Sequence, residues 1–590
     1  MSMLTRWGRE LDPDAVLTEY PRPQLVRDSY LNLNGRWDYA ITGDGGAEPA
    51  AYDGTIVVPF SPEAELSGVG RQLMPGQTLW YRRTLVLPDG FGTGGRVLLH
   101  FGAVDQTCRV LLNGVEVGAH TGGYLPFSCD VTGALRDGEN VLTVAVRDDT
   151  DTVPHSRGKQ KLERGGIWYT PQSGIWQTVW AERVPDVHVE RLTLTPHLAD
   201  SCVEVTVHAA EGEADVEILA AGSVVARATV PAGRPVRVPI PDVRPWSPED
   251  PFLYDVTVEL GADRVRSYVG MRSFGVVTDA DGVPRLLLNG RPYFHAGVLD
   301  QGYWSDGMYT PPSDEAMIHD IVTMKRLGFT MLRKHIKIEP LRWYHHCDRL
   351  GMLVWQDMVN GGGRYHPLVV TAPAFVPFHL PDRWFGRPHR ERFMAELRET
   401  VEHLRNVVSI AVWVPFNEGW GQFDAARVAG ELAALDPTRT VDHASGWHDQ
   451  GAGDLRSLHV YFRRFRAPRR RRDRRALVLS EYGGYGLRVD GHTFNDRNFG
   501  YRRYDTPERL GAAFARLHAE QIVPAIRRGL SATVYTQLSD VEDELNGLLT
   551  YDREVLKLPE DLVRAVNRRL TLGQTPDASD GSGAAAVVAG

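Results

Sequence analysis

The pattern of apolar residues changes near residue 276, and this change constrains the fold of the 590-residue chain more than any other feature. Before it, short alternating runs such as Trp80–Leu87 and Asn140–Arg147 are separated by Gly, Pro and Asp. A period of two residues between turn signals is typical of antiparallel β-sandwiches. After it, strand-like runs alternate with segments of roughly 3.6-residue apolar periodicity, as in 316–327 and 510–522. This alternation indicates parallel strands joined by helices.

We predict three domains followed by a tail. Residues 1–185 and 186–275 form two β-sandwiches, the second of immunoglobulin type, and residues 276–570 form one larger domain. Eight strand–helix units in this domain favour a (β/α)8 TIM barrel, whose active site lies at the C-terminal ends of the strands. The predicted strands are Tyr293–Val298, Thr330–Arg333, Met352–Asp357, Ser409–Val414, Thr440–His443, Ser457–Tyr461, Ala476–Ser480 and Ala532–Thr536. Residues 571–590, rich in Gly, Ala, Ser and Asp, are predicted to be a disordered tail.

The composition excludes several classes of function. With 24% charged residues and a formal net charge of −9, the chain is not a basic nucleic-acid binder. No apolar run approaches the ~18 residues that span a bilayer, and the first residues hold no signal-peptide core, so we expect a cytoplasmic protein without a membrane partner. The four cysteines are too scattered for a disulfide framework, and no phosphate loop or dinucleotide fingerprint occurs. We predict no cofactor; a bound Mg²⁺ or Na⁺ ion and a homo-oligomer stay open.

Two glutamates follow predicted barrel strands. Asn417–Glu418 comes just after the fourth strand, and Glu481 comes just after the seventh. A carboxylate beside buried apolar residues must be paired, hydrogen-bonded or functional, because desolvating it alone is costly. Either glutamate by itself is better explained by a structural role. Together at one barrel mouth, they fit the two-carboxylate chemistry of glycoside hydrolysis, in which a separation of about 5 to 5.5 Å gives retention.

The domain order and these strand ends resemble glycoside hydrolase family 2, the group of β-galactosidases, β-glucuronidases and β-mannosidases. The resemblance extends over most of the chain and includes the segments 174–180, 245–254, 270–274 and 289–292. It implies a jelly-roll-like, sugar-binding N-terminal sandwich. It also implies that Glu418 is the general acid/base, that Glu481 is the nucleophile, and that Asn417 binds the sugar 2-hydroxyl.

Electrostatics supports this division of roles between the two glutamates. While Glu481 is ionised, its charge disfavours ionisation of Glu418, which then keeps the proton that a leaving oxygen needs. Once Glu481 is esterified, that charge is gone, and Glu418 can deprotonate and activate water.

The residues that should recognise the sugar differ from those of better-known family members. After the second strand an Arg-x-x-His-Tyr-Pro segment is common in the family, whereas here Arg333 is followed by Lys334, His335 and Lys337. The Asn-x-Lys signature associated with β-glucuronidases is not evident. Because only six lysines stand beside 60 arginines, a retained lysine is a candidate for a position that requires a compact ammonium. We predict that these four residues contact substrate. Lys159 and Lys161, in a Gly-rich loop of the first domain, fit a substrate-facing or a surface role equally well.

Aromatic and polar residues near other strand ends complete the predicted substrate site. Aromatic rings cover the C–H face of a sugar, and polar groups bind its hydroxyls. The further predicted residues are Trp355, Trp420, Trp447, His459, Tyr461, Tyr535 and Gln537. Between the sixth and seventh strands, the run Arg463–Arg475 holds nine arginines in thirteen residues. A solvated loop is its simplest interpretation, and a subsite for an anionic or extended polysaccharide aglycone is the alternative.

We therefore predict a retaining exo-β-glycosidase of β-galactosidase type that acts on an oligosaccharide or glycoside. Its substrate carries a terminal non-reducing β-D-galactosyl or galactosyl-like residue: a galactopyranoside, a galactofuranoside or an arabinoside. The alternatives are a β-glucuronidase, a β-mannosidase, or a non-catalytic carbohydrate-binding protein on the same scaffold. The presence of both Glu418 and Glu481 argues against the last, because binding alone does not require two glutamates at these positions.

Overall fold

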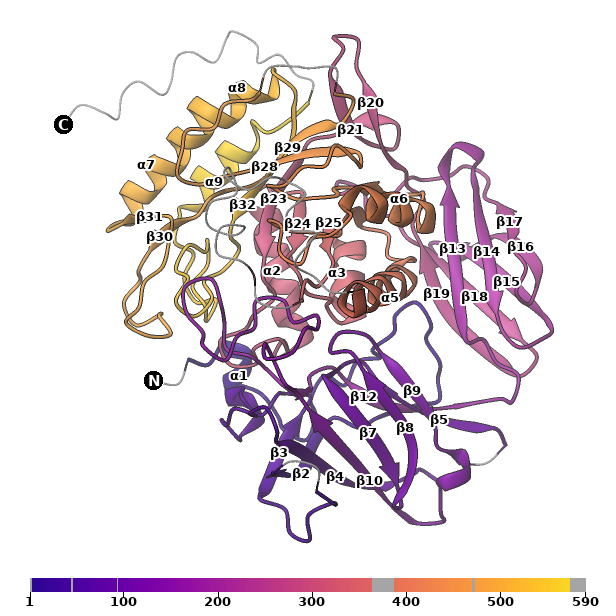
Figure 1. Cartoon of the computed structure of the whole chain (residues 1–590). Coiled ribbons are helices and arrows are strands. Elements are labelled where there is room, and N and C mark those ends of the chain that lie inside the picture. Colours follow the sequence, from indigo (N-terminus) through magenta and orange to yellow (C-terminus); the bar gives the residue numbers. More distant parts are fainter. Residues whose placement is uncertain are drawn as a thin grey trace.

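The computed structural model describes residues 3–43, 46–92, 94–362, 365, 387–468 and 473–572. Figure 1 shows two β-sandwiches packed beside a barrel of strands and helices, which confirms the predicted fold class. Most of the predicted tail and the centre of the Arg463–Arg475 run, residues 469–472, lie outside the described residues. Within the described ranges, none of the helices has the length and apolar content that a membrane crossing requires.

The first sandwich consists of two antiparallel sheets. The larger has the strand order β3-β2-β4-β10-β7-β8, and the smaller has the order β1-β12-β5-β9. Alternate strand residues, including Trp37, Tyr81 and Phe101, are buried between the sheets, as the period-two pattern predicts. The strands are β1 (Tyr30–Asn32), β2 (Gly35–Thr42), β3 (Gly54–Val58), β4 (Thr78–Val86), β5 (Arg96–Phe101), β7 (Thr107–Leu112), β8 (Val115–Thr121), β9 (Phe127–Asp130), β10 (Glu139–Arg147) and β12 (Val179–Val184).

The second sandwich is smaller and packs sheet β13-β14-β17 against sheet β16-β15-β18-β19. Its core is built mainly from valines such as Val205, Val216 and Val256. The predicted boundary after residue 275 falls inside β20 (Phe274–Thr278), which pairs with β21 (Pro284–Leu288). The sandwich strands are β13 (Arg191–His197), β14 (Cys202–His208), β15 (Glu213–Ala220), β16 (Ser223–Pro231), β17 (Val236–Pro239), β18 (Tyr254–Leu260) and β19 (Asp263–Val269).

The barrel is a parallel sheet with the strand order β27-β26-β25-β24-β23-β32-β29-β28. Its two ends meet where the Asp454 N–H, just before β28, donates to Val441 O of β27 at 2.8 Å. The strands are buried on both faces, because side chains fill the barrel and helices cover it. They are β23 (His295–Asp300), β24 (Met331–Lys334), β25 (Leu353–Asp357), β26 (Ile410–Val414), β27 (Thr440–Val441), β28 (Leu455–Val460), β29 (Ala476–Gly483) and β32 (Leu530–Thr536).

Helices connect most, but not all, of these strands. Residues 442–454, all of them described, join β27 to β28 without a helix, and the described residues between β28 and β29, 461–468 and 473–475, hold none either, so at least one of the eight predicted strand–helix units is wrong. The start of α2 follows its sequence: Ser313 caps the helix by accepting from the Ala316 N–H, and acidic residues follow in its first turn. The main helices are α2 (Asp314–Arg326), α3 (Leu341–Leu350), α5 (Arg387–Leu404), α6 (Ala425–Leu435), α7 (Pro507–Leu517) and α9 (Glu560–Asn567).

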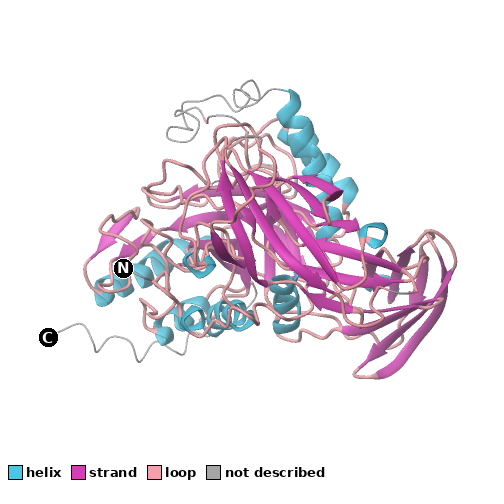
Figure 2. Ribbon diagram, turned by 90° about the horizontal axis from the view of Figure 1, so that it is seen from below, coloured by secondary structure: helices cyan, strands magenta, loops and turns pink. Residues whose placement is uncertain are grey.

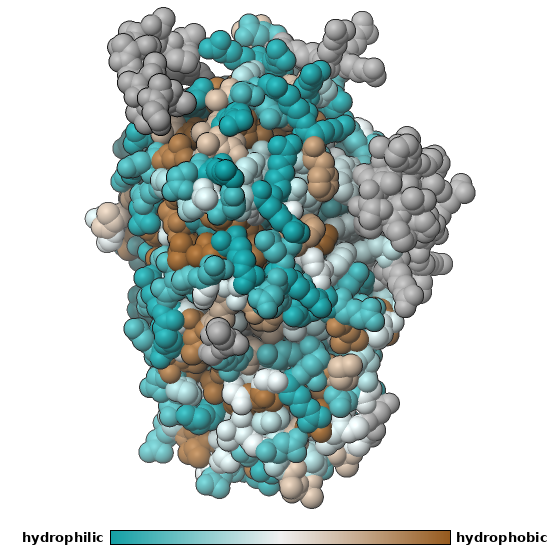
Figure 3. All heavy atoms as spheres, turned by 90° about the vertical axis from the view of Figure 1, so that its left-hand side faces the viewer, coloured by the Kyte–Doolittle hydropathy of each residue, from teal (hydrophilic) through white to brown (hydrophobic). Residues whose placement is uncertain are grey.

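A long loop of the first sandwich, residues 155–169, packs on the barrel mouth. The N–H groups of Arg157 and Gly158 both donate to Asn360 O, three residues beyond the end of β25, at 3.1 and 3.0 Å. Ser156 and Gly361 pair through their backbones in an isolated antiparallel β-bridge. In the view of Figure 2 the first sandwich lies across the barrel, with helices visible around its edge. Figure 3 shows a third face, on which apolar residues form separate patches among hydrophilic ones.

Candidate active site

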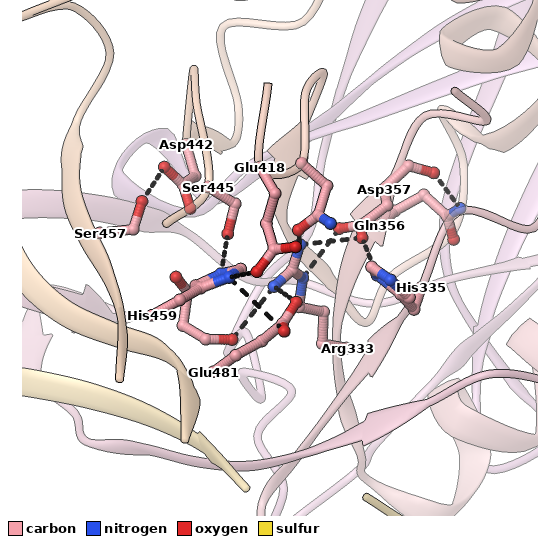
Figure 4. A network of polar contacts seen from close by, with 12 residues as sticks. Arg333, His335, Gln356, Asp357, Glu418, Asp442, Ser445, Ser457, His459 and Glu481 are labelled. Carbon is pink, nitrogen blue, oxygen red and sulfur yellow. Dashed lines mark hydrogen bonds and ion pairs between the residues drawn. The ribbon is translucent and has the colours of Figure 1, made fainter. Parts of the chain in front are cut away.

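A buried polar network occupies the C-terminal end of the barrel, and Figure 4 shows it from close by. Arg333 and Asp357 come from the last residues of β24 and β25, and His459 and Glu481 come from β28 and β29. Glu418 follows β26 in the turn that its sequence position predicts. Five separate strands thus bring their ends to one point, as a closed parallel barrel requires.

Glu481 is held by three groups and is 5% exposed. Arg333 Nη1 donates to its Oε1 at 3.0 Å, and the Tyr461 hydroxyl donates to its Oε2. His459 Nδ1 lies 3.5 Å from the same Oε2. Burial by itself raises the pKa of Glu481, but the neighbouring charges of His459 and Arg333 outweigh it and hold that pKa below the ordinary value of a glutamate. Glu481 is therefore poised as a carboxylate.

Glu418 has the opposite electrostatic environment. Burial raises its pKa, the charge of Glu481 adds to that increase, and the hydrogen bond from His459 opposes it. His459 Nδ1 lies 2.6 Å from Glu418 Oε1, while Nε2 of the same ring lies 3.2 Å from Ser445 Oγ. The backbone of Glu418 has a φ of +52°, a strained conformation that the bond from its N–H to Ser445 O, at 3.0 Å, helps to hold.

The two carboxyl groups are close together. One oxygen of Glu418, one oxygen of Glu481 and a ring nitrogen of His459 all lie within 4.8 Å of one another. This spacing is near the ~5 to 5.5 Å between the carboxyl groups of retaining glycosidases and well below the ~6.5 to 9.5 Å of inverting ones. The same three residues could also hold a metal ion, because each offers a ligand atom.

Arg333 organises the rest of the network. Its guanidinium donates to both oxygens of Asp357 at 3.0 Å each, to Asn417 Oδ1 at 2.9 Å and to Ser480 O at 3.0 Å. Such a bidentate pair is planar and rigid, so it fixes both partners. Asp357 in turn lies 2.8 Å from His335 Nδ1. Arg333, His335 and Asn417 therefore lie together, as the sequence predicts. Each already makes a hydrogen bond within the protein.

The predicted aromatic residues are only partly brought to this site. Tyr461 binds Glu481 and stacks on Tyr501 with 3.8 Å between ring centroids. The Trp420 ring lies beside His335, with 6.5 Å between centroids, and the half-buried Trp447 lies beside His459 at 6.0 Å. Gln537 is buried and accepts from Gln301 Nε2 at 2.7 Å.

Two predicted aromatic residues do not face the barrel mouth. Trp355 is completely buried, one layer below Asp357, and its indole N–H donates to His295 Nδ1 at 3.0 Å. Tyr535 packs outside the barrel against Phe514 of α7, with 5.1 Å between centroids. Its neighbour Thr536 is the residue that contacts the site, 3.0 Å from the Tyr461 hydroxyl. The prediction for Tyr535 is wrong because successive strand residues point to opposite faces, and the one for Trp355 is wrong because its ring lies in a deeper layer of the barrel interior, packed among core residues.

The predicted substrate contacts of Lys334 and Lys337 are also wrong. The two side chains are 1% and 0% exposed, and Glu339 accepts from both ammonium groups at 2.7 and 2.9 Å. Lys334 also donates to Asp300 at 2.6 Å, and Lys337 donates to two backbone carbonyls. Lys334 lies on the outer face of β24, and Lys337 lies just beyond the strand. A buried ion cluster therefore explains why lysine, rare in this chain, occurs at these two positions.

Replacing Lys334 with methionine will destabilise the protein without changing what the folded protein binds. We expect the free energy of unfolding to fall by about 3 to 5 kcal/mol, because Asp300 is left buried without its cation. Lys337→Met should cost less, because burial already lowers the pKa of Lys337 to about 8 and disfavours its charged form. Urea unfolding measures the loss, with the half-buried Lys161→Met as control. A changed KM at unchanged stability would contradict this structural role.

Several residues that complete the site carry no motif by which the sequence could have identified them. Asp357 ends a predicted strand but carries no motif, and Tyr501 lies in a long segment after β29. Trp168 comes from the loop of the first sandwich and packs on Trp420, with 5.1 Å between ring centroids. The sequence signals for this loop are its two scarce lysines and its glycines, of which Gly165 and Gly166 have positive φ; none of them points to Trp168.

Three family profiles match the chain in the order of its domains. They are the sugar-binding domain of glycosyl hydrolases family 2 over residues 71–181, glycosyl hydrolases family 2 over 187–272, and the family 2 TIM barrel domain over 283–477. The β-galactosidase of Arthrobacter sp. (strain B7) is 27% identical over 409 residues, which cover 66% of this chain and 36% of the relative. The β-galactosidase of Thermoanaerobacter pseudethanolicus is 25% identical over 61% of this chain and 47% of its own. The alignments thus span less than half the length of these relatives.

Solved structures of two other enzymes share the fold over nearly their whole length. A β-D-glucuronidase of Dictyoglomus thermophilum matches with a TM-score of 0.72 and 17% identity, covering 93% of this chain and 98% of its own. A β-galacturonidase of Eisenbergiella tayi matches with a TM-score of 0.68 and 19% identity, covering 95% and 100%. These two likenesses concern the fold alone, whereas the three profiles together match well over half of the sequence. The chain belongs to glycoside hydrolase family 2.

Proposed function

We propose that the protein is a retaining exo-β-glycosidase of β-galactosidase type. The observation that carries the proposal is the pair of glutamates whose carboxyl oxygens lie within 4.8 Å and whose pKa values are shifted in opposite directions. A pair of titratable groups pushed apart in this way is suited to one acid and one nucleophile. A binding protein has no use for either the spacing or the asymmetry.

In the first step Glu481 attacks the anomeric carbon while Glu418 protonates the leaving oxygen. The Glu481–carbon bond forms, the bond from the carbon to the leaving oxygen breaks, and the proton of Glu418 leaves with the aglycone. Arg333 and Tyr461 hold Glu481 through both of its oxygens, so the attacking group is oriented before the substrate arrives.

In the second step water replaces the aglycone. Once Glu481 is esterified its charge is lost, and with it one cause of the raised pKa of Glu418. Glu418 then takes a proton from water, whose oxygen attacks the anomeric carbon and releases Glu481. His459 Nδ1, 2.6 Å from Glu418, can stabilise the carboxylate that forms after the first step. Two inversions at one carbon give net retention.

One observation supports the substrate class, and a second supports action on terminal residues. Curated relatives that align over about two thirds of this chain carry the name β-galactosidase. The loop 155–169 packs across one side of the barrel mouth through its bonds to Asn360, and a site closed on one side favours removal of terminal residues over internal cleavage. Because the segment after Arg333 is altered, galactofuranosides and arabinosides belong to the proposed class beside galactopyranosides.

A panel of aryl β-glycosides in both ring forms tests the proposal. We expect the highest kcat/KM on a galactosyl or galactosyl-like substrate, with glucuronides and mannosides as the comparison arms. Proton NMR of the first product formed should show the β-anomer. Turnover of only the glucuronide or the mannoside would overturn the substrate class, an α-anomer would overturn retention, and no turnover of any substrate would favour a carbohydrate-binding protein.

A further inference from the structure

We propose that Lys159, supplied by the first sandwich, is a substrate-binding and specificity-determining residue of the barrel site. Its ammonium binds acceptor oxygens of the sugar that lies between Glu418 and Glu481. The proposal rests on the proposed function, because it assumes that a sugar occupies this position.

The backbone places Lys159 at the barrel mouth. Gly158, just before it, donates to Asn360 O at 3.0 Å and packs so closely on the chain after His335 that a Cβ would lie 3.0 Å from Ile336 O. Gly158 also has a φ of +63°, which favours glycine. On the other side, Lys159 O accepts from the Tyr169 N–H at 3.0 Å. The residue is thus fixed across the ends of β24 and β25.

The side chain of Lys159 lacks the partners that the other deeply buried lysines have. It is 6% exposed, yet within the described residues no hydrogen bond or ion pair joins its ammonium to a carboxylate or carbonyl, and the centroid of the Tyr169 ring lies 5.4 Å from the nitrogen. By contrast, Lys557 donates to Asp540 at 2.5 Å and to Leu545 O at 3.1 Å. Because the side chain is nearly buried and its ammonium has no protein acceptor, a ligand that supplies acceptor oxygens is favoured at this position.

The charge of Lys159 acts on two groups of the site, His335 and Glu418. Burial lowers the pKa of His335, and Lys159 is the charge that lowers it most after burial. The same ammonium opposes the raised pKa of Glu418. Beside His335 lies a second donor without an acceptor in the described part of the chain, the indole N–H of Trp420, which is 2% exposed.

Two donors without protein acceptors at one barrel mouth, one of them beside His335, indicate a ligand with two or more acceptor oxygens. Vicinal hydroxyls of a neutral sugar and the carboxylate of a uronic acid both supply them. A lysine from the first sandwich can bind either kind of sugar. In this chain it would supply the ammonium, because the Asn-x-Lys signature associated with β-glucuronidases is not evident.

The first test replaces Lys159 with methionine, which keeps the apolar stem and removes the donor. We expect kcat/KM on the best aryl glycoside to fall about 10- to 100-fold, as for a lost hydrogen bond from a charged donor. The melting temperature should stay equal or rise, because an uncompensated charge is removed. Lys161→Met, on the same loop but stacked on Trp168 at 3.8 Å, is the matched control and should keep its kcat/KM. A lower melting temperature with unchanged kcat/KM would show a structural lysine and overturn the proposal.

The second test identifies the atoms that Lys159 binds. If they are hydroxyls, one monodeoxy aryl galactoside will lose kcat/KM in the wild type and lose much less in Lys159→Met. If they are a carboxylate, the wild type will prefer the galacturonoside to the galactoside, and Lys159→Met will lose that preference. Identical losses on every analogue in both proteins would show that Lys159 does not contact the sugar.

A calorimetric measurement separates this proposal from the proposed function. Binding of galactose and of galacturonate to the wild type and to Lys159→Met requires no turnover. Weaker binding to the variant supports the role of Lys159 even if every aryl glycoside fails as a substrate. Equal binding to both proteins counts against Lys159, whatever the activity of the wild type.

Discussion

Glu481→Gln will reduce kcat by a factor on the order of 10⁵, the range seen when the nucleophile of a covalent mechanism is removed. The amide cannot attack the anomeric carbon, and its nitrogen would meet either the Arg333 guanidinium, 3.0 Å from Oε1, or the Tyr461 hydroxyl. Single-turnover kinetics on an activated aryl glycoside gives the loss. In the wild type, a 2-deoxy-2-fluoro glycoside of the best substrate should accumulate as an ester on Glu481, visible in a peptide mass map.

A buried glutamate of the first sandwich provides the matched control for this substitution. Burial raises the pKa of Glu63 to about 8, so this side chain is mostly protonated at neutral pH and resembles glutamine already. Its two oxygens accept from the N–H groups of Leu73 and Ser173 at 2.9 and 3.0 Å. The single amide oxygen of glutamine can accept only one of these two hydrogen bonds in the same geometry. Glu63→Gln should therefore keep kcat while altering stability slightly. A fluoroglycoside label on any residue other than Glu481 would refute the nucleophile assignment.

Glu418→Ala will produce a loss that depends on the leaving group. For substrates with poor leaving groups we expect kcat/KM to fall about 10²- to 10⁴-fold, the usual contribution of general acid catalysis. Activated aryl glycosides should form the glycosyl-enzyme almost normally and then stall, because no base activates water. Azide needs no base, so it should restore turnover and yield a β-glycosyl azide.

The pH dependence provides a second reading of the same variant. The proposed mechanism requires ionised Glu481 and protonated Glu418 in the wild type. The lowered pKa of Glu481 keeps activity down to acidic pH, and activity is lost on the alkaline side as pH rises through the raised pKa of Glu418. In Glu418→Ala, the alkaline limb for activated substrates should disappear. If that limb persists unchanged, or azide fails to restore turnover, Glu418 is not the acid/base.

The sequence predicts the fold and the centre of the site because both depend on short-range patterns. Strands of a barrel are read from apolar runs, and the residues after them reach the mouth, as Glu418 does beyond Val414. The missing helix between β27 and β28 escaped prediction because the connection is short and its residues serve the site. Ser445, which contacts His459 at 3.2 Å, lies in that connection.

The surroundings of the two glutamates were predicted less well, and the errors for Tyr535 and Lys334 have a common cause. Thr536 and Tyr535 are adjacent in sequence but lie on opposite faces of β32, and the same alternation separates Arg333 from Lys334 on β24. Segment position alone does not decide which of two neighbours faces the barrel interior. Lys159 could not be placed at all, because no pattern in the first sandwich says which barrel strand its loop will meet.

The attachment of the 155–169 loop to Asn360 has a consequence for how enzymes of this kind diversify. The bonds to Asn360 run from backbone N–H groups to a backbone carbonyl, so they do not depend on loop side chains, although Ser156, Arg157 and Tyr169 add side-chain bonds to Glu396, Gly362 and Glu544. Natural or engineered variation can change the loop side chains that make no such bond, Lys159 among them, while the attachment and the two glutamates persist. Preference for a new sugar can then arise by exchanging a single peptide segment between homologues, leaving the reaction chemistry intact.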